Sequence, residues 1–259
     1  MLFRRKKIGL ALGGGSVRGF AHLGVLKVIE EYRVPINYIA GTSIGAVFGA
    51  LYSSGLPVEK IISIANKIRW GKLFTAFSIN IGGLSSSVEI EKLVKRFIPQ
   101  DSFKELKIPL KVIVTNITDG VMELRDSGSL SKAVRISATF PGLYSPVEED
   151  GKMYCDGGMM SQVPVEIVKK MGADYVVGVD VLPYCQMKKK HYNALVIMDR
   201  SIDLMLQQQI KYKRKTLLLK PVDKFINSLD IKKKTALIKM GEQSARAELI
   251  PFLKRKKII

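Results

Sequence analysis

The feature that most constrains the fold of this chain is the pentapeptide Gly41-Thr42-Ser43-Ile44-Gly45, a G-x-S-x-G motif. It follows the apolar run Ile36–Ala40, which predicts a strand, and it precedes the small and apolar residues 46–51, which predict a helix. A serine on a tight strand-to-helix turn is typical of a nucleophile elbow, in which glycines stand where a β-carbon would clash. We therefore expect Ser43 to be a nucleophile and its two flanking glycines to form the elbow.

The first part of the chain alternates between predicted strands and helices. Residues 8–12 predict a short buried strand and residues 20–32 a helix, ahead of the strand and helix that flank the pentapeptide. This β-α-β-α order predicts an α/β fold with three layers, in which helices cover both faces of a central, mostly parallel sheet. Further strands are predicted at 110–115, 175–181 and 216–220, and further helices at 88–97, 194–209 and 235–253.

Length and composition predict one intracellular domain. The chain has 259 residues, of which 47% are hydrophobic, so residues 1–259 are expected to form a single domain with a basic tail, 254–259, that frays. No run approaches the roughly 18 apolar residues of a membrane span, and the basic start of the chain lacks a signal-peptide core. Cys155 and Cys185 have no metal or redox spacing and argue against a disulfide framework, so no metal and no cofactor is expected.

The net charge of +19 predicts attraction to anionic surfaces. The excess is concentrated in five basic runs, Arg4–Lys7, Lys188–Lys190, Lys211–Lys215, Lys232–Lys234 and Lys254–Lys257. Near an anionic membrane each Lys or Arg is worth about 1 kcal/mol, so a few on one face allow reversible docking. We expect a cytoplasmic protein that contacts the inner face of the membrane, with a merely solvated basic surface as the alternative. Nucleic acid is not expected as a partner, because the chain has no recognised binding motif for it.

A glycine-rich loop, Gly13-Gly14-Gly15-Ser16-Val17-Arg18-Gly19, joins the first predicted strand to the first predicted helix. It lacks the strict G-x-G-x-x-G of a dinucleotide site, and no Gly-Lys-Ser/Thr follows, which excludes a Walker loop. The other interpretation is an oxyanion hole, in which backbone N–H groups face the negative oxygen of an acyl-transfer intermediate. In that case Arg18 either adds positive charge or holds the loop by pairing with a carboxylate. Since both motifs follow early parallel strands, we expect them to share one edge of the sheet.

An elbow serine normally needs a histidine base, and this chain has only two histidines. His22 lies inside the first predicted helix, as a packed residue would, and His191 follows three lysines in a polar connection. A carboxylate acting directly is the remaining option, and Asp156, between a short strand-like run and two glycines, is the best candidate. An ordinary Asp-Gly turn is the alternative for Asp156. The aromatic and glycine-containing segment Trp70–Ser87 is either a mobile cover or a packed helical insertion.

Four sequence blocks of this chain resemble the patatin-like phospholipases, a family of lipid acyl hydrolases with a Ser-Asp dyad. The resemblance covers most of the chain, and the blocks occur in the family's order and begin with the glycine loop and the elbow. They are Leu12–Leu26, Gly41–Ala46, Ser137–Gly142 followed by Pro146-Val147, and Asp156–Gly158. The resemblance implies a patatin-like fold and a phospholipid or another acyl ester as substrate, without a catalytic histidine.

The resemblance also implies roles for individual residues. Ser43 corresponds to the nucleophile and Asp156 to the general base, while Gly14, Gly15 and Ser16, together with Arg18, correspond to the oxyanion loop. Where the family usually has the third glycine of this loop, the chain has Ser16, which either narrows the backbone angles or caps the helix. Two alternatives remain: a thioesterase or acyltransferase with the same dyad, and a non-catalytic basic protein that binds lipid surfaces.

Overall fold

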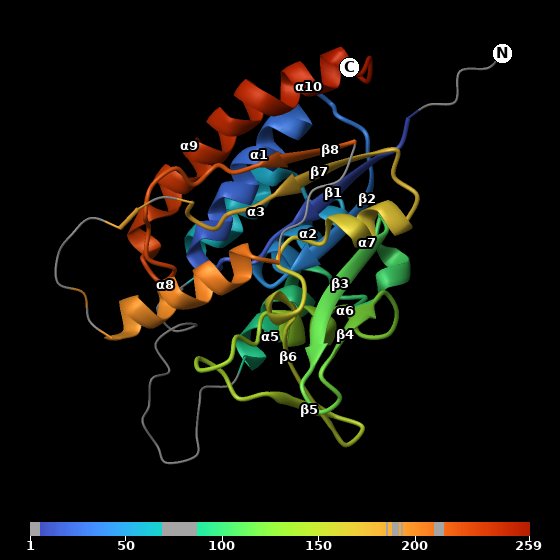
Figure 1. The fold of residues 1–259 in the computed structure, drawn as a ribbon. Helices are drawn as coiled ribbons and strands as arrows, with labels where there is room; N and C mark the ends of the chain where they lie inside the picture. Colours follow the sequence, from blue (N-terminus) through green and yellow to red (C-terminus); the bar gives the residue numbers. More distant parts are fainter. Residues whose placement is uncertain (1–5, 69–86, 185, 188–191, 193, 210–214) are drawn as a thin grey trace.

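The computed structural model describes residues 6–68, 87–184, 186–187, 192, 194–209 and 215–259. The described strands form one twisted sheet with helices on both faces, which confirms the predicted three-layer α/β class (Figure 1). The strands are β1 (Ile8–Leu12), β2 (Ile36–Thr42), β3 (Leu110–Asn116), β4 (Val121–Arg125), β5 (Val147–Glu149), β6 (Lys152–Asp156), β7 (Tyr175–Val179) and β8 (Thr216–Leu219). The helices are α1 (Phe20–Glu31), α2 (Ile44–Ser53), α3 (Val58–Lys67), α5 (Val88–Phe97), α6 (Leu130–Ser137), α7 (Val165–Lys170), α8 (Ala194–Gln207), α9 (Lys234–Ser244) and α10 (Ile250–Arg255).

Alternation along the strands separates two apolar cores. On β1, Leu10 and Leu12 face the larger core beneath α1, α2 and α9, whereas Ala11 faces a smaller core beneath α7. All three side chains are fully buried, as expected for a central strand covered on both sides. The layers are therefore unequal, with most of the helical mass on one face of the sheet (Figure 1).

The elements that the sequence predicts are present, and the sequence misses several short ones. The predicted strand and helix around the pentapeptide appear as β2 and α2, and the predicted helix 235–253 appears as α9 and α10 joined by the π turn Ala245–Leu249. The helices α3, α6 and α7 and the strands β4 and β5 were not predicted. Except for the ten-residue α3, these have eight residues or fewer, too short for a clear periodic pattern.

The sheet is parallel at its centre and antiparallel at one end. Hydrogen-bonded neighbours follow the path β5-β6-β3-β2-β1-β7-β8, in which β6 and β2 bond successive parts of one edge of β3 while β4 pairs with its other edge. The run from β3 to β8 is parallel, whereas β6 runs antiparallel to β3. Because β2 is parallel to β3 and β6 is antiparallel to it, the C-terminal ends of β2 and β6 point toward each other.

The ends of β2 and β6 meet on the same side of β3. Thr42, the last residue of β2, pairs with Ile113 of β3, and Asp156, the last residue of β6, pairs with the next residue, Val114. Since β4 occupies the other side of β3, β2 and β6 share one side and approach each other end to end. The register therefore brings Ser43, which follows Thr42, next to Asp156.

The C-terminal residues 254–259 belong to the fold, so the expectation of a frayed tail is wrong. α10 extends to Arg255, and the amide of Lys256 donates to the carbonyl oxygen of Phe252. The amide of Ile258 donates to the carbonyl oxygen of Leu253, and its side chain packs against the main core. The packing of Ile258 thus keeps residues 254–259 in the fold, although their positive charge led us to expect fraying. Among the described residues, no helix has the length and apolarity needed to cross a bilayer.

Two glycines allow α1 and α9 to pack backbone against backbone. A β-carbon at Gly24 of α1 would overlap the carbonyl oxygen of Ile238, and one at Gly241 of α9 would overlap that of Ala21. Neither obstacle is a side-chain end that can turn away. Close packing of these helices therefore requires glycine at both positions.

We predict that Gly24→Ala lowers stability by about 1–3 kcal/mol, because the new methyl group forces the two helices apart. Gly49→Ala in α2 is the matched control, since a β-carbon there meets only side chains, at 3.4–3.6 Å. Alanine also has the higher helix propensity, so the control is expected to be neutral or stabilising. Urea denaturation followed by circular dichroism measures both variants. Equal loss of stability in the two would contradict the proposed close contact.

Candidate active site

The conformation of Ser43 is that of a strained turn between β2 and α2. Its backbone has φ 55° and ψ −125°, in the region that side-chain-bearing residues rarely occupy. The amide of Ser43 donates to Oγ of Ser137 at 2.9 Å, which helps to hold the turn. A β-carbon at Gly41 would lie 2.7 Å from Cα of Ala46, and one at Gly45 would overlap the carbonyl oxygen of Leu12. The elbow therefore needs both glycines.

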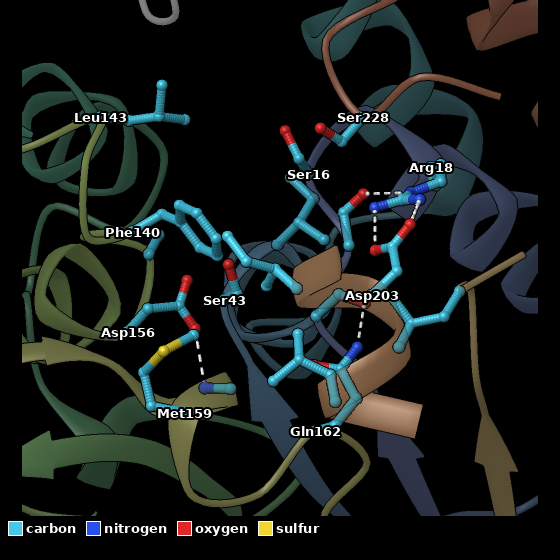
Figure 2. Close-up of a pocket in the computed structure, with 18 of the residues that line it drawn as sticks. Ser16, Arg18, Ser43, Phe140, Leu143, Asp156, Met159, Gln162, Asp203 and Ser228 are labelled. Carbon is cyan, nitrogen blue, oxygen red and sulfur yellow. Dashed lines mark hydrogen bonds and ion pairs between the residues drawn. The ribbon is translucent and has the colours of Figure 1, made fainter. Parts of the chain in front are cut away.

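Asp156 is buried at the end of β6, with its carboxyl group directed toward Ser43 (Figure 2). Its Oδ1 accepts a hydrogen bond from the amide of Gly158 at 2.7 Å, whereas Oδ2 is buried and has no partner in hydrogen-bond geometry among the described residues. The Ser43 hydroxyl lies close enough to lower the pKa of the carboxyl group. The two groups are thus adjacent but loosely bonded, as catalytic pairs often are before substrate binds.

Burial sets the proton affinity of Asp156. Loss of water raises the pKa of this carboxyl to about 7, although the Ser43 hydroxyl and the Gly158 amide both oppose the shift. A carboxylate with the usual pKa of an aspartate is a weak base near neutral pH. The burial of Asp156 therefore brings it into the range in which a general base is most effective.

The glycine loop lies directly against Ser43, but Gly14 differs from the expectation. The amide of Gly14 already donates to the carbonyl oxygen of Gln162 at 3.1 Å, and Nε2 of Gln162 donates to the carbonyl oxygen of Gly14 at 2.8 Å. The amides of Gly15 and Ser16 have no hydrogen-bond partner among the described residues, and both residues line the pocket. The amides of Gly15 and Ser16 are therefore available to bind an oxyanion, whereas the amide of Gly14 is already hydrogen-bonded to Gln162.

Ser16 restricts the backbone angles of the loop and does not cap the helix. Its φ of 52° and the φ of 148° at Gly15 place both residues in left-handed backbone regions. The hydroxyl of Ser16 is buried without a partner among the described residues, and it does not cap a helix. Serine at this position therefore adds backbone strain without adding a capping hydrogen bond.

Arg18 holds the loop by pairing with a carboxylate, which is one of the two roles considered for it. Its guanidinium makes two hydrogen bonds to Asp203 of α8, at 2.5 and 2.7 Å, and both side chains are only 2% exposed. Nε of Arg18 also donates to the carbonyl oxygen of Gly15 at 3.3 Å. Figure 2 shows the guanidinium held by Asp203, so Arg18 supports the loop through this ion pair.

His22 is fully buried in α1 and supports the same loop. Its Nε2 lies 2.8 Å from the carbonyl oxygen of Gly13, and burial lowers the pKa of the imidazole to about 4. The ring is therefore neutral, and the carbonyl acceptor assigns the proton to Nε2. This geometry agrees with the packed role expected for His22. His191 and most of the segment Trp70–Ser87 lie outside the described residues.

The Ser43 and Asp156 side chains line a pocket that is open to solvent (Figure 2). Most of its wall is apolar, and it comes from α2, α5, α8 and the segment after α6. The apolar lining residues are Ile44, Val47, Ile90, Leu93, Phe140, Leu143, Met159, Leu182, Ile202 and Leu206. Such a wall suits a hydrocarbon chain. Among the described residues, no group of His, Cys, Asp or Glu has the arrangement of a metal site.

Three supporting residues were not recognised from the sequence. Gln162 and Asp203 touch the glycine loop from positions more than a hundred residues away, and Ser137 bonds the amide of Ser43 across 94 residues. Ser137 lies in one of the sequence blocks that the chain shares with a known family, which is a signal that could have found it. Asp203 is one of two acidic residues, with Asp199, in a helix rich in apolar residues, a weaker signal of a buried ion pair.

Known proteins share sequence with this chain. A sequence model of the family described as "Patatin-like phospholipase" matches residues 10–169, more than half of the chain. The chain is 30% identical over 185 residues to "Lysophospholipase NTE1" of Debaryomyces hansenii, a match that covers 70% of this chain and 12% of that protein. It is 33% identical over 184 residues to "Neuropathy target esterase sws" of Drosophila melanogaster, which covers 67% of this chain and 13% of that protein.

The fold is similar to that of a solved bacterial structure. The crystal structure of VipD from Legionella pneumophila superposes with a TM-score of 0.61 at 12% sequence identity, covering 94% of this chain and 66% of that one. At this identity the likeness concerns the fold alone. The curated relatives are much longer than this chain, which spans about an eighth of their length.

We predict that Asp203→Asn destabilises the protein by roughly 3–5 kcal/mol, because it leaves the buried Arg18 guanidinium with only the more distant carboxylate of Asp199, at 3.8 Å, as counter-charge. Glu31→Gln is the matched control: Glu31 also makes two hydrogen bonds to an arginine, Arg246, but both partners are exposed. Solvent screens such a pair, so the control should hardly change the denaturation midpoint. Chemical denaturation of both variants tests this, and a midpoint unaffected by Asp203→Asn would contradict it.

Proposed function

The chain belongs to the patatin-like phospholipase family, and on that basis we propose that it is a lipid acyl hydrolase, a serine esterase acting on phospholipids, lysophospholipids or related acyl esters. The observation that carries the proposal is the meeting of the Ser43 hydroxyl and the Asp156 carboxyl in an apolar pocket, beside two backbone amides that have no hydrogen-bond partner among the described residues. The names of two curated relatives, a lysophospholipase and an esterase, support the same class of reaction. We take residues 1–259 to form one catalytic domain.

In the proposed reaction, Asp156 accepts the proton of the Ser43 hydroxyl as Oγ attacks the carbonyl carbon of the ester. The oxyanion that forms is stabilised by the amides of Gly15 and Ser16. As the intermediate collapses, the ester C–O bond breaks and Asp156 protonates the departing alcohol, which leaves Ser43 acylated. Asp156 then takes a proton from an attacking water, the bond to Oγ breaks, and Ser43 regains its proton as the fatty acid is released.

The pocket wall favours an acyl chain as the buried part of the substrate. Ile90 and Leu93 of α5 face this space together with Ile202 and Leu206 of α8. Each methylene that moves from water into such a pocket contributes about 0.8 kcal/mol. The polar part of the lipid then stays near the opening, where the pocket meets solvent.

The charge of the chain supports a location at a membrane. With a net charge of +19, the protein is attracted to anionic lipid such as that of the cytoplasmic leaflet. We therefore propose a cytoplasmic enzyme that contacts the inner face of the membrane peripherally.

We predict that Ser43→Ala and Asp156→Asn each lower ester hydrolysis by at least about a thousandfold while the fold persists. Asp180→Asn is the matched control, because Asp180 is also fully buried and burial raises its pKa to about 6, yet it does not line the pocket. The control should retain most of the activity. The assay uses a panel of phospholipids, lysophospholipids and short acyl esters, with circular dichroism to confirm folding.

Two results would overturn the dyad. One is loss of activity in His191→Ala combined with activity retained in Asp156→Asn, which would make histidine the base. The other is a folded wild-type protein whose Ser43 does not react with a fluorophosphonate probe. The second result would favour a non-catalytic lipid-surface protein.

We predict that kcat/KM for an uncharged short-chain ester rises with pH through about 7 and is level above it. Burial raises the pKa of Asp156 from 3.8 to about 7, and only the ionised carboxylate accepts the Ser43 proton. Below pH 7 the protonated fraction grows, so the rate falls about tenfold per pH unit. A pH series from about 5 to 9 tests this. Constant activity down to pH 5 would show that the base is not a carboxyl group with a raised pKa.

A further inference from the structure

The outward face of α8 carries no charged residue. Its exposed positions recur with helical spacing and form a single stripe, which we call the α8 stripe. The stripe consists of Ala194, Ile197, Met198, Ser201, Leu204, Met205 and, just past the helix, Gln208. In this chain 25% of residues are charged, and the exposed face of a surface helix is normally where such residues lie. The outward face of α8 therefore departs from the usual pattern of a surface helix.

The charged residues of α8 lie on its inner side and at its flanks. Asp203 is buried against Arg18, and Asp199 accepts a hydrogen bond from the Ser228 hydroxyl at 2.7 Å. The guanidinium of Arg200 donates to the carbonyl oxygen of Pro183 at 2.8 Å. These contacts fix the rotation of the helix about its axis. The apolar side chains of the α8 stripe thus cannot turn inward without breaking a buried ion pair.

The exposure of the α8 stripe is large for apolar side chains. Ile197, Met198, Leu204 and Met205 are between 46% and 70% exposed, and all four lie on one helix face. Single exposed apolar residues are ordinary, but a contiguous group marks a surface that is covered by a partner or a membrane.

Charge identifies the kind of partner. Ser228 bonds Asp199 of α8, and Phe225 contacts the ring of Tyr192, which precedes the helix. The segment 223–233 that contains both residues carries the exposed lysines Lys224, Lys232 and Lys233 and one exposed carboxylate, Asp223. In the sequence, α8 also stands between the basic runs Lys188–Lys190 and Lys211–Lys215. An apolar helix face between basic residues is the pattern of a helix that lies in an anionic membrane interface. A second copy of the chain is a poor partner, because two molecules of charge +19 repel each other.

We propose that the α8 stripe is the membrane-docking surface of this protein and inserts into the headgroup region of an anionic phospholipid bilayer. This inference rests on the proposed function, since it takes the bilayer as the source of the substrate. The opposite side of α8 lines the pocket through Ile202 and Leu206. A docked α8 therefore places the bilayer on one side of the helix and Ser43 on the other, so a lipid enters the pocket along α8.

The test measures binding to vesicles without hydrolysis. The Ser43→Ala protein is mixed with phosphatidylcholine vesicles that contain about one-third phosphatidylglycerol or none, and bound protein is separated by sedimentation. Leu204→Ser with Met205→Ser in the same background removes two members of the α8 stripe. Val121→Ser with Met153→Ser is the matched control, because these apolar residues are 45% and 44% exposed on β4 and β6.

We expect binding to the anionic vesicles to fall at least about tenfold in the α8 variant and to stay unchanged in the control. Binding of the unchanged stripe should weaken with salt and be weak on pure phosphatidylcholine. With Ser43 intact, the α8 variant should hydrolyse a soluble short-chain ester normally, because none of its changes touches the pocket lining.

Several outcomes would overturn the docking surface: no vesicle binding, equal binding by both variants, or equal loss in the control. A change from dimer to monomer in the α8 variant, without vesicle binding, would assign the stripe to self-association instead. Failure of the proposed function gives a different result. In that case the Ser43→Ala protein still binds vesicles through α8, while the wild-type protein hydrolyses none of the lipids.

Discussion

The meeting of β2 and β6 on one side of β3 is the constraint on which the candidate site depends. Ser43 and Asp156 are separated by more than a hundred residues, and the pairing of Thr42 with Ile113 and of Asp156 with Val114 brings them together. A shift of one residue would turn each side chain to the other face of the sheet. Gly157 protects this register, because a β-carbon there would overlap the carbonyl oxygen of Ile113.

Hydrogen bonds with neighbouring residues hold the glycine loop and so position the amides of Gly15 and Ser16. His22 bonds the carbonyl of Gly13, Gln162 bonds Gly14 at both its amide and its carbonyl, and Arg18 bonds the carbonyl of Gly15. These contacts use carbonyl oxygens and the Gly14 amide, and within the described part of the chain they leave the amides of Gly15 and Ser16 unpaired. Donors fixed in advance stabilise a developing oxyanion without having to reorganise during the reaction.

Local features of the site could be predicted from the sequence, and long-range ones could not. The elbow follows from five adjacent residues, and the strand and helix around it follow from periodicity, so both match the structure. Asp156 lies in an Asp-Gly turn that resembles many others. The family resemblance identifies it in the sequence, whereas its position beside Ser43 follows from its pairing with β3. The roles of Gln162 and Asp203 arise entirely from tertiary contacts, which no local pattern encodes. The expectation that residues 254–259 fray was wrong, because it rested on their charge and did not consider the packing of Ile258 against the core.

The buried pair of Arg18 and Asp203 links the two faces of α8. Asp203 forms hydrogen bonds with Arg18, which in turn bonds the glycine loop at the carbonyl of Gly15. The same ion pair fixes which side of α8 faces outward. Breaking such a pair costs roughly 3–5 kcal/mol, so a movement that lifts α8 away from the pocket is strongly opposed. It would also remove the contact of Arg18 with α8 just when the oxyanion must be stabilised. We therefore expect a lipid to enter with α8 in place, which makes this helix a fixed wall between bilayer and Ser43 and not a lid.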